Sequence, residues 1–333
     1  MFEPVDLPGS ATAQVLATAA WHAMHAPSAL NTQPWRWRAA ARTLELRADL
    51  DRQLTTTDRE GRLLHLACGA ALHHAYVALL ADGWQVRIAL RPDPADDPKL
   101  LARVTLIGRG MPGATATALR DAIGRRRTDR RAFADTPVPA VLLDRLRRAV
   151  ELHGTYLHLV RPDQLPMLAV ATASAAADEL ADPDYRAELA WWTTRPAGSG
   201  DGVPATSAVR QAPRRVPVRD HTIGRHVPGL EVGAGTDRGA SYGILFGSTD
   251  EPEAWLRAGE ALSALLLSAT DAGLSAAVIS DPFEREWPRH LVGELLAAVG
   301  TPYLAVRIGL PVEAAPLPAT PRRDPTDVIE ISG

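Results

Sequence analysis

Apolar positions along the chain alternate between helical and strand spacing. Apolar residues three and four positions apart predict a long buried helix at 61–82 and a second one at 253–272. Alternating apolar and polar residues predict a strand at 43–48, which forms a hairpin with 35–38. The same patterns predict the remaining strands at 84–90, 101–107, 155–160, 242–246, 276–279 and 304–308. They predict the remaining helices at 12–25, 115–125, 140–151, 164–179, 182–192 and 289–299.

The start of the helix at 61–82 carries a capping signal. Glu60 lies three residues after Thr57, which is the spacing of a capping box, so we predict that these side chains cap the first turn. The helix contains the most apolar long stretch of the chain, but His65, His73 and His74 interrupt it. We therefore interpret it as a buried helix and not as a membrane span.

The two long helices share a repeated motif. Gly69-Ala70-Ala71-Leu72 and Gly259-Glu260-Ala261-Leu262 both read Gly-x-Ala-Leu, and in each case another glycine follows fourteen positions after the first. The offset is constant at 190 residues, and strands are predicted on both sides of each helix. Four small or apolar residues can match by chance in an alanine-rich chain. The shared element order favours a duplication, which would place the two-fold contact of a dimer inside one chain.

The region 196–239 shows no regular periodicity. It is rich in glycine and proline and carries several arginines, among them Arg214 and Arg219. A structureless connector of this length is uncommon in a compact protein. The region is either a lid with short elements of its own or partly disordered, and we favour the lid.

Composition narrows the classes of protein and partner. The 333 residues suggest one large domain or two of ordinary size, and the net charge of −3 gives no indication of a nucleic-acid or acidic membrane partner. Cys68 is the only cysteine, which excludes an internal disulfide and a cysteine metal cluster and fits a reducing cytoplasm. The first twelve residues lack a secretion-signal pattern, so we expect a cytoplasmic location. The histidines lack further zinc ligands, and we expect no metal site.

A stiff polar loop separates the first helix from the first strand. Pro27 and Pro34 restrict the backbone at its two ends, and Ser28, Asn31 and Gln33 lie between them. Such a loop is either a plain helix ending that leads into a strand or a platform for a planar polar ligand.

Arginines are concentrated at 125–131, where five of them accompany Thr128. Forked guanidinium donors and a hydroxyl suit a phosphate group. The alternative is a solvated helix end, which the helix dipole favours. Arg322-Arg323 near the C-terminus is a second candidate for phosphate contact.

Two glycine motifs match the signatures of a dinucleotide site and a serine hydrolase, but their surroundings do not fit either site. Gly108 to Gly113 matches Gly-x-Gly-x-x-Gly, but the apolar strand and acidic residue that a dinucleotide site needs do not follow. Gly239 to Gly243 matches Gly-x-Ser-x-Gly, but Ser241 begins a strand, whereas a hydrolase serine lies between a strand and a helix. We interpret the first motif as a hinge and do not assign a hydrolase.

These motifs resemble those of the nitroreductase family of flavoproteins. Residues 26–35 resemble its Ala-Pro-Ser-x-x-Asn-x-Gln-Pro-Trp signature, and residues 126–133 resemble its Arg-Arg-Ser-x-Arg-x-Phe signature, with Thr128 in place of serine and Phe133 one residue late. Gly273-Leu274 and Arg323-Asp324-Pro325 are similar to its C-terminal landmarks. The arginine-rich signature normally comes first in the chain. The reversed order and the length resemble the Acg subgroup.

The resemblance implies an α+β fold, a three-layer α/β/α sandwich of the FMN-dependent nitroreductase type, duplicated inside one chain as a pseudo-dimer. Its first half would be 10–110 and its second half 115–330, with the lid at about 196–239 inserted in the second. The first half would supply the Pro-Ser-x-x-Asn loop and the second the FMN phosphate site, so that one complete flavin site forms. The residues that the resemblance assigns to FMN are Arg126, Arg127, Thr128, Arg130, Ser28, Asn31, Gln33, Ser280, Asp281 and Arg323.

Two functions follow from the resemblance, and no catalytic side chain is assigned for either. The first is an FMN-dependent oxidoreductase that takes hydride at the flavin N5 atom and reduces a small conjugated acceptor such as a nitro compound or a quinone. The second is a protein that sequesters or stores FMN with little turnover. A small-molecule substrate is expected, with NAD(P)H as the candidate electron donor, and a monomer is expected because the dimer contact is internal.

Overall fold

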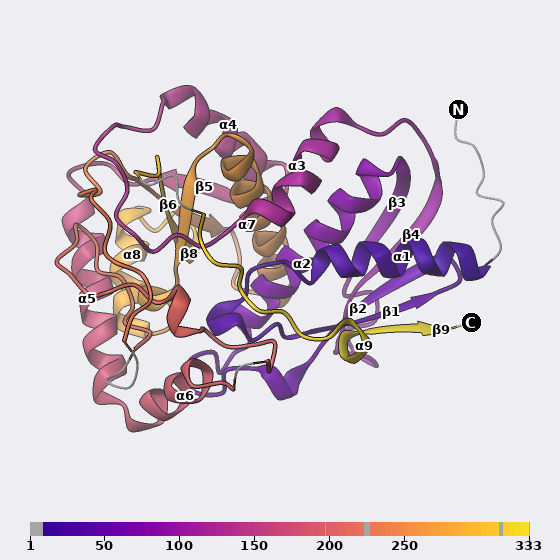
Figure 1. Cartoon of the computed structure of the whole chain (residues 1–333), viewed down its shortest axis with the longest axis horizontal. Coiled ribbons are helices and arrows are strands. Elements are labelled where there is room, and N and C mark those ends of the chain that lie inside the picture. The colour runs from indigo at the N-terminus through magenta and orange to yellow at the C-terminus, as the bar shows by residue number, and fades with distance from the viewer. Residues whose placement is uncertain (1–8, 197, 223–226, 313–315, 333) are drawn as a thin grey trace.

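The computed structural model describes residues 9–196, 198–222, 227–312 and 316–332. Two sheets flank a central pair of helices, α2 (Arg62–Ala81) and α7 (Pro252–Asp271), as Figure 1 shows. The first sheet has the order β3-β4-β2-β1-β9, formed by Trp84–Leu90, Leu100–Arg109, Thr43–Ala48, Trp35–Ala40 and Ile329–Ser332. The second has the order β5-β6-β8-β7, formed by Tyr156–Leu159, Ser241–Gly247, Thr301–Gly309 and Ser275–Ile279. The predicted α+β class is confirmed.

The other helices lie close to their predicted positions. They are α1 (Gly9–Ala23), α3 (Ala114–Arg125), α4 (Ala140–Glu151), α5 (Leu165–Ala181), α6 (Pro183–Thr193), α8 (Glu286–Leu295) and the short α9 (Pro325–Val328). Helix α8 begins three residues before its predicted start and ends four before its predicted end. Its end is early because Ala297 and Ala298 have φ values of 50° and 55°, which no right-handed helix accommodates.

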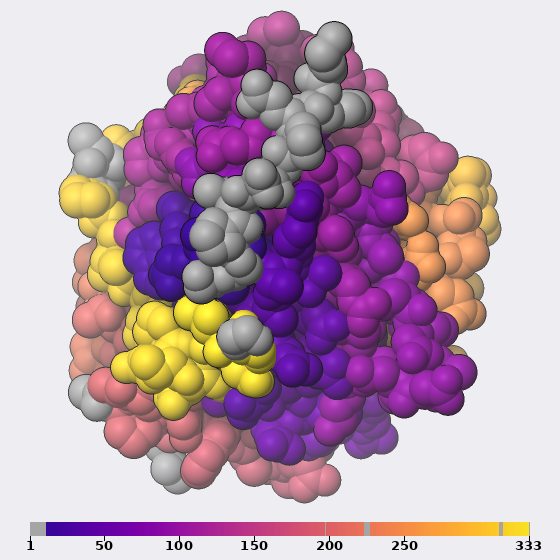
Figure 2. All heavy atoms as spheres, turned by 90° about the vertical axis from the view of Figure 1, so that its right-hand side faces the viewer, coloured from indigo at the N-terminus to yellow at the C-terminus, as the bar shows by residue number. Residues whose placement is uncertain are grey.

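The strand order supports the duplication that the glycine repeat predicts. Strands β3-β4-β2-β1 and β7-β8-β6-β5 follow one another in the same way, and every neighbouring pair in both series is antiparallel. A separate hydrophobic core lies against each sheet. The half boundaries stay a prediction, with one departure. Strand β9, at the C-terminal end, pairs in parallel with β1 of the first sheet, so it lies beside α1 and β1 (Figure 2).

The repeated glycines form the crossing point of α2 and α7. A Cβ atom on Gly69 would lie 2.0 Å from the Leu256 carbonyl oxygen, and one on Gly259 would lie 2.1 Å from the Leu66 carbonyl oxygen. Leu66 and Leu256 are 190 residues apart, as the two glycines are, so the contact is reciprocal like that of a two-fold dimer. The repeat is therefore a packing motif, because only glycine permits so close an approach.

Adding one methyl group at this crossing is expected to destabilise the fold. Gly259→Ala should lower the free energy of unfolding by about 1–3 kcal/mol, because the two helices must separate. Gly293→Ala is the matched control, since a Cβ atom on this helix glycine would have nothing within 4 Å. It should be neutral or stabilise by up to about 1 kcal/mol. Equal effects of the two changes in urea unfolding would contradict the packing role.

The capping-box prediction at the start of α2 is wrong. The Asp58 carboxylate accepts hydrogen bonds from the backbone N–H groups of Leu63 (3.0 Å) and Leu64 (2.8 Å). The Thr57 hydroxyl instead donates to Glu188. Gly61 has a φ of 76°, so the backbone turns sharply just before the helix. This turn places the Asp58 side chain beside the first N–H groups of the helix. By length and composition α2 could cross a membrane, but 83% of its apolar window is buried in the protein, as expected of a core helix.

The largest difference between the halves lies between β5 and β6. In the first half a tight turn joins β1 to β2, whereas in the second half α5, α6 and the region 196–239 intervene. The described part of that region has short elements of its own; we keep the name lid for it, and its role as a lid stays a prediction. They include a helical turn at Ala205–Ser207 and a bridge between Val209 and Leu230.

Candidate functional site

Two adjoining cavities lie where the two halves meet, and they share the walls formed by Pro27, Ser28, Thr128 and Arg130. The first, here called the wide cavity, has about 1020 Å³ of empty space, its open mouth included. Its floor and sides are mainly apolar and come from α2, α7, β7, β8 and the lid; they include Leu63, Leu66, Leu262, Ile279, Leu304 and Val216. The second, here called the arginine pocket, is lined by Arg126, Arg127, Asn31, Ser207, Thr320 and Arg322, among others.

The arginine pocket concentrates positive charge without a counter-charge. Among the described residues no carboxylate forms an ion pair with Arg126, Arg127 or Arg322, and the buried Nε atom of each lacks a hydrogen-bond partner. Burial, together with the charge of Arg127, lowers the pKa of Arg126 to about 10. Burial and the charges of Arg126 and Arg127 lower the pKa of Arg322 to about 9. Arg126 is buried and Arg127 is half-buried beside it, so the charge in this pocket favours an anion.

The arginine-rich segment reaches the site because it leaves α3 and runs beside β7. Thr128 forms a parallel bridge with Ala276, and the Asp129 N–H donates to the Ala276 carbonyl oxygen at 3.0 Å. This extended course sends Arg126 and Arg130 toward the cavities, while Arg131 forms an ion pair with Asp129. Arg125 remains exposed at the helix end.

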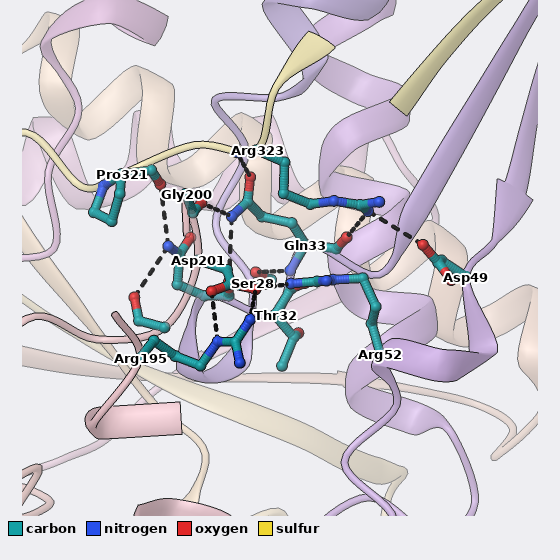
Figure 3. Close-up of polar contacts among 12 residues, drawn as sticks. Ser28, Thr32, Gln33, Asp49, Arg52, Arg195, Gly200, Asp201, Pro321 and Arg323 are labelled. Atoms are coloured by element: carbon teal, nitrogen blue, oxygen red, sulfur yellow. Dashed lines mark hydrogen bonds and ion pairs between the residues drawn. The ribbon is translucent and has the colours of Figure 1, made fainter. Parts of the chain in front are cut away.

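The loop at 26–35, here called the Pro-Ser loop, is hydrogen-bonded to the lid and to the C-terminal segment around Pro321 and Arg323, here called the tail (Figure 3). The Asn31 amide donates to the carbonyl oxygens of Gly202 and Pro321, both at 3.1 Å. The Gln33 amide donates to the Gly200 carbonyl oxygen at 2.7 Å and accepts from the Arg323 N–H at 3.1 Å. Asn31 and Gln33 have φ values of 56° and 50°, and these contacts compensate for that strain.

Two residues predicted to bind the cofactor, Gln33 and Arg323, lie outside both cavities, and their cofactor role stays a prediction. Gln33 lines neither cavity, because its side chain is taken up by the lid and the tail. Arg323 also lies outside both cavities: its Nη1 atom donates to the carbonyl oxygens of Gln33 and Trp35 and pairs with Asp49. Its neighbour Arg322 lines the arginine pocket and donates to Asn31 Oδ1 at 3.0 Å. Ser28 and Asn31, in contrast, are brought beside Arg126, Arg127, Thr128 and Arg130 as predicted.

The base of the lid is also held by an ion pair that titrates in acid. Asp201 accepts from Arg52 at 2.5 Å and from Arg195 at 2.7 Å (Figure 3). Burial acts to raise the pKa of Asp201, but the hydrogen bonds from Arg195 and Arg52 outweigh it and lower the pKa to about 2. Because this value is below that of an unfolded aspartate, about 3.9, the stabilisation is present above about pH 4 and is lost as the pH falls toward 2.

Asp201→Asn should therefore lower the unfolding temperature at neutral pH by several degrees. Its difference from the parent protein should shrink as the pH falls from about 5 to about 2. Asp51→Asn, on an exposed carboxylate in the same neighbourhood, should have little effect at any pH. A difference for Asp201→Asn that does not change with pH would contradict the ion pair's contribution.

Lid residues form the remaining wall of the wide cavity, and the sequence did not single them out for this role. Arg219 and His221 line it opposite Ser280 and Asp281, and Arg219 pairs with Asp281. Burial, followed by the charges of Arg130 and Arg219, holds the pKa of His221 well below its usual range, so the imidazole is neutral. Arg130 lies at the junction of the cavities and donates to the Ser207 carbonyl oxygen at 3.2 Å.

Comparison with known proteins identifies the family. No family model matches the chain. The chain is 39% identical over 325 residues to a Mycobacterium tuberculosis protein named "Putative NAD(P)H nitroreductase", and the match covers 96% of this chain and 92% of that protein. It is 38% identical over 329 residues to a second protein of that organism with the same description and the name acg, and the match covers 96% of both. This chain belongs to the nitroreductase family.

Comparison with solved structures finds nitroreductases. One is the FMN-dependent nitroreductase NfnB from Mycobacterium smegmatis in complex with NADPH, which is 17% identical, with a TM-score of 0.42, 66% of this chain and 100% of that chain covered. Another is a nitroreductase with bound FMN from Bacteroides fragilis, which is 16% identical, with a TM-score of 0.37, 60% of this chain and 91% of that chain covered.

Residues from both predicted halves of the chain line the same pair of cavities. The first half supplies the Pro-Ser loop and the apolar face of α2, and the second half supplies residues 126–130 and the end of β7. The reversed motif order therefore does not prevent the two signatures from meeting, because Ser28 and Thr128 line both cavities.

Proposed function

We propose that the chain binds FMN in the adjoining cavities and transfers hydride through it from a reduced nicotinamide to a small conjugated acceptor, such as a nitro compound or a quinone. The observation that carries the proposal is the arginine pocket, with three cations that lack a counter-charge among the described residues, adjoining a cavity whose apolar side chains come from α2, α7 and β8. A phosphate supplies the missing charge, and a flat aromatic ring system suits the apolar space. The names of the relatives agree with this activity.

The residues present fit the cofactor. Arg126, Arg127 and Arg322 would hold the phosphate through their guanidinium groups, and Thr128 would add a hydroxyl. Arg130, at the junction, would stabilise negative charge on the ring system, where the family often has a lysine. When bound, FMN supplies the hydride-transfer chemistry at its N5 atom. Ser280, Asp281 and His221 would orient what lies in the wide cavity, and the lid would keep water out.

A second candidate function is FMN sequestration. The lid residues 216–219 line the wide cavity, and Arg219 is anchored in a group of buried carboxylates. A lid that stayed closed would exclude a nicotinamide and leave a bound flavin without turnover.

Anaerobic mixing separates the two functions. FMN-loaded protein is mixed with NADH, NADPH or dithionite, and the flavin absorbance is followed. The proposal predicts bleaching by at least one nicotinamide and recovery on addition of a quinone. Bleaching by dithionite alone would contradict it and favour sequestration.

The internal two-fold contact bears on assembly and location. Because α2 and α7 pack against each other within one chain, as two subunits would in a dimer, we propose that the protein is a monomer. We also propose a cytoplasmic location. Gel filtration with light scattering should give the mass of one chain, 35.7 kDa, and a stable dimer would contradict the proposal.

A further inference from the structure

Three buried carboxylates converge on one arginine at the edge of the wide cavity. Arg219 Nε donates to Asp281, and Arg219 Nη2 lies 2.6 Å from Glu284 Oε2 and 3.5 Å from Glu179 Oε1. The three acids come from different places: Glu179 from α5, Asp281 from the turn after β7, and Glu284 from just beyond it. We call these four residues the carboxylate cluster.

The carboxylate cluster carries more acid than its single cation can balance. The side chains of Glu179 and Glu284 are 3% and 2% exposed, so water cannot screen them. Burial raises the pKa of Glu179 to about 10, with support from Glu284 and Asp281 and against the effect of Arg219; burial likewise raises the pKa of Glu284. Two neighbouring buried carboxylates do not both ionise, so Glu179 and Glu284 share one proton.

Two buried oxygens at the carboxylate cluster lack partners in the described structure. Within the described part of the chain, Glu284 Oε1 and the Tyr185 hydroxyl are buried without a hydrogen-bond partner. The Glu179 and Glu284 side chains lie within hydrogen-bonding reach of each other, and a hydrogen bond between two carboxyl groups requires a proton on one of them. A proton shared by Glu179 and Glu284 supplies the donor that this pair needs.

The carboxylate cluster also connects two spaces. Arg219 and Asp281 line the wide cavity. Glu284 lines an open groove on the other side, together with Asp58 and Arg285. A proton held between Glu179 and Glu284 is therefore close to the cavity on one side and to solvent on the other.

We propose that the Glu179–Glu284 pair stores the proton that is consumed in the wide cavity. A proton from solvent in the groove then replaces it by way of Glu284. This inference rests on the proposed function. Two-electron reduction of an acceptor by hydride from a dihydronicotinamide needs one further proton to give the neutral reduced product. An O–H bond of the pair breaks, the proton passes across the Asp281 carboxylate to the acceptor, and the carboxylate left behind stays beside Arg219 until a solvent proton replaces the one lost.

Other charged and titratable groups face the carboxylate cluster and set the conditions of a test. They are Tyr185 and Asp182 near α6, Arg130 and His221 at the wide cavity, and Asp58 and Arg285 at the groove. Burial raises the pKa of both Asp58 and Glu260 to about 7. At about pH 8.5 Asp58 and Glu260 are mainly ionised, so a protonated carboxyl group at this pH reports on the Glu179–Glu284 pair.

Infrared spectroscopy at about pH 8.5 tests whether the proton is held. The purified protein should show a carbonyl stretch of a protonated carboxyl group that shifts in D₂O. Glu179→Gln should remove the band, and so should Glu284→Gln. Agreement between two independent variants guards against an effect of misfolding in one of them. Glu286→Gln, an exposed acid of the same groove, should keep it. A parent protein without the band would overturn the proposal, whatever its flavin does.

Reduction tests whether the proton is used. In the reduced-minus-oxidised spectrum obtained with dithionite, the band should shift or bleach in the parent and in Glu286→Gln and be absent in Glu179→Gln. Reoxidation by a quinone should be at least tenfold slower in Glu179→Gln, with a changed solvent isotope effect and unchanged FMN affinity. A band unaffected by reduction, or equal reoxidation rates, would overturn the supply role. If neither NADH nor NADPH reduces the FMN-loaded protein, only the proposed function is contradicted. The spectra obtained with dithionite do not depend on reduction by a nicotinamide.

Discussion

Arg126→Ala combined with Arg322→Ala should abolish retention of FMN during purification. Both side chains line the arginine pocket, and a hydrogen bond to a charged group contributes about 1.5–3 kcal/mol. Loss of both should weaken FMN binding by at least about 100-fold, since 1.4 kcal/mol corresponds to a factor of ten. Isothermal titration of the apoprotein with FMN measures this directly.

The same double variant should raise the stability of the apoprotein. Arg126 and Arg322 repel one another without a counter-charge in the described structure, so their removal relieves repulsion. A higher unfolding temperature together with lost FMN binding separates a binding effect from misfolding. Arg125→Ala, on the exposed neighbour, should leave both quantities unchanged. Unchanged FMN affinity in the double variant would contradict the phosphate assignment.

Asp237→Asn should have the largest effect on stability. The Asp237 carboxylate is fully buried, accepts the Phe133 N–H at 2.7 Å, and pairs with Arg214 and Arg307, both at 2.8 Å. Asparagine preserves the shape and tolerates the φ of 61°, but it leaves two buried guanidinium groups without their counter-charge. Loss of one partner of a buried pair costs about 3–5 kcal/mol, which chemical denaturation would detect.

The change should also weaken FMN binding, because Arg307 lines the wide cavity and its Nη2 atom donates to the Asp129 and Arg131 carbonyl oxygens of the arginine-rich segment. Glu231→Gln is the matched control from the same insertion. Its pair with Arg210 is exposed and should contribute no more than about 1 kcal/mol. Similar losses for the two variants would contradict the central position of Asp237.

The arginine-rich segment shows how far the sequence could predict the site. The high number of arginines drew attention to 125–131. It does not show which of these side chains face the pocket. Arg126 faces the pocket and Arg131 pairs with Asp129, because the segment runs extended beside β7 and its side chains point in different directions. The same limit applies at Arg322 and Arg323, where neighbouring side chains in an extended tail point to opposite places.

Elements with clear periodicity were predicted well, and the rest depended on long-range contacts. The Gly69 and Gly259 repeat indicated a duplication that the matching strand orders support. Strand β9 was missed because four residues are too short for a pattern, and its place is decided by pairing with β1. Arg219 and His221 were missed as cavity residues because nothing local in the lid indicates what it covers.

The central claim is that the two halves build one site whose arginine pocket takes a phosphate. Titration of the apoprotein with FMN and with riboflavin tests it most directly, because the two ligands differ only in that phosphate. We expect FMN to bind at least about 100-fold more tightly than riboflavin, and Arg126→Ala with Arg322→Ala to bring the two affinities close together. Equal affinity of the parent protein for FMN and riboflavin would contradict it.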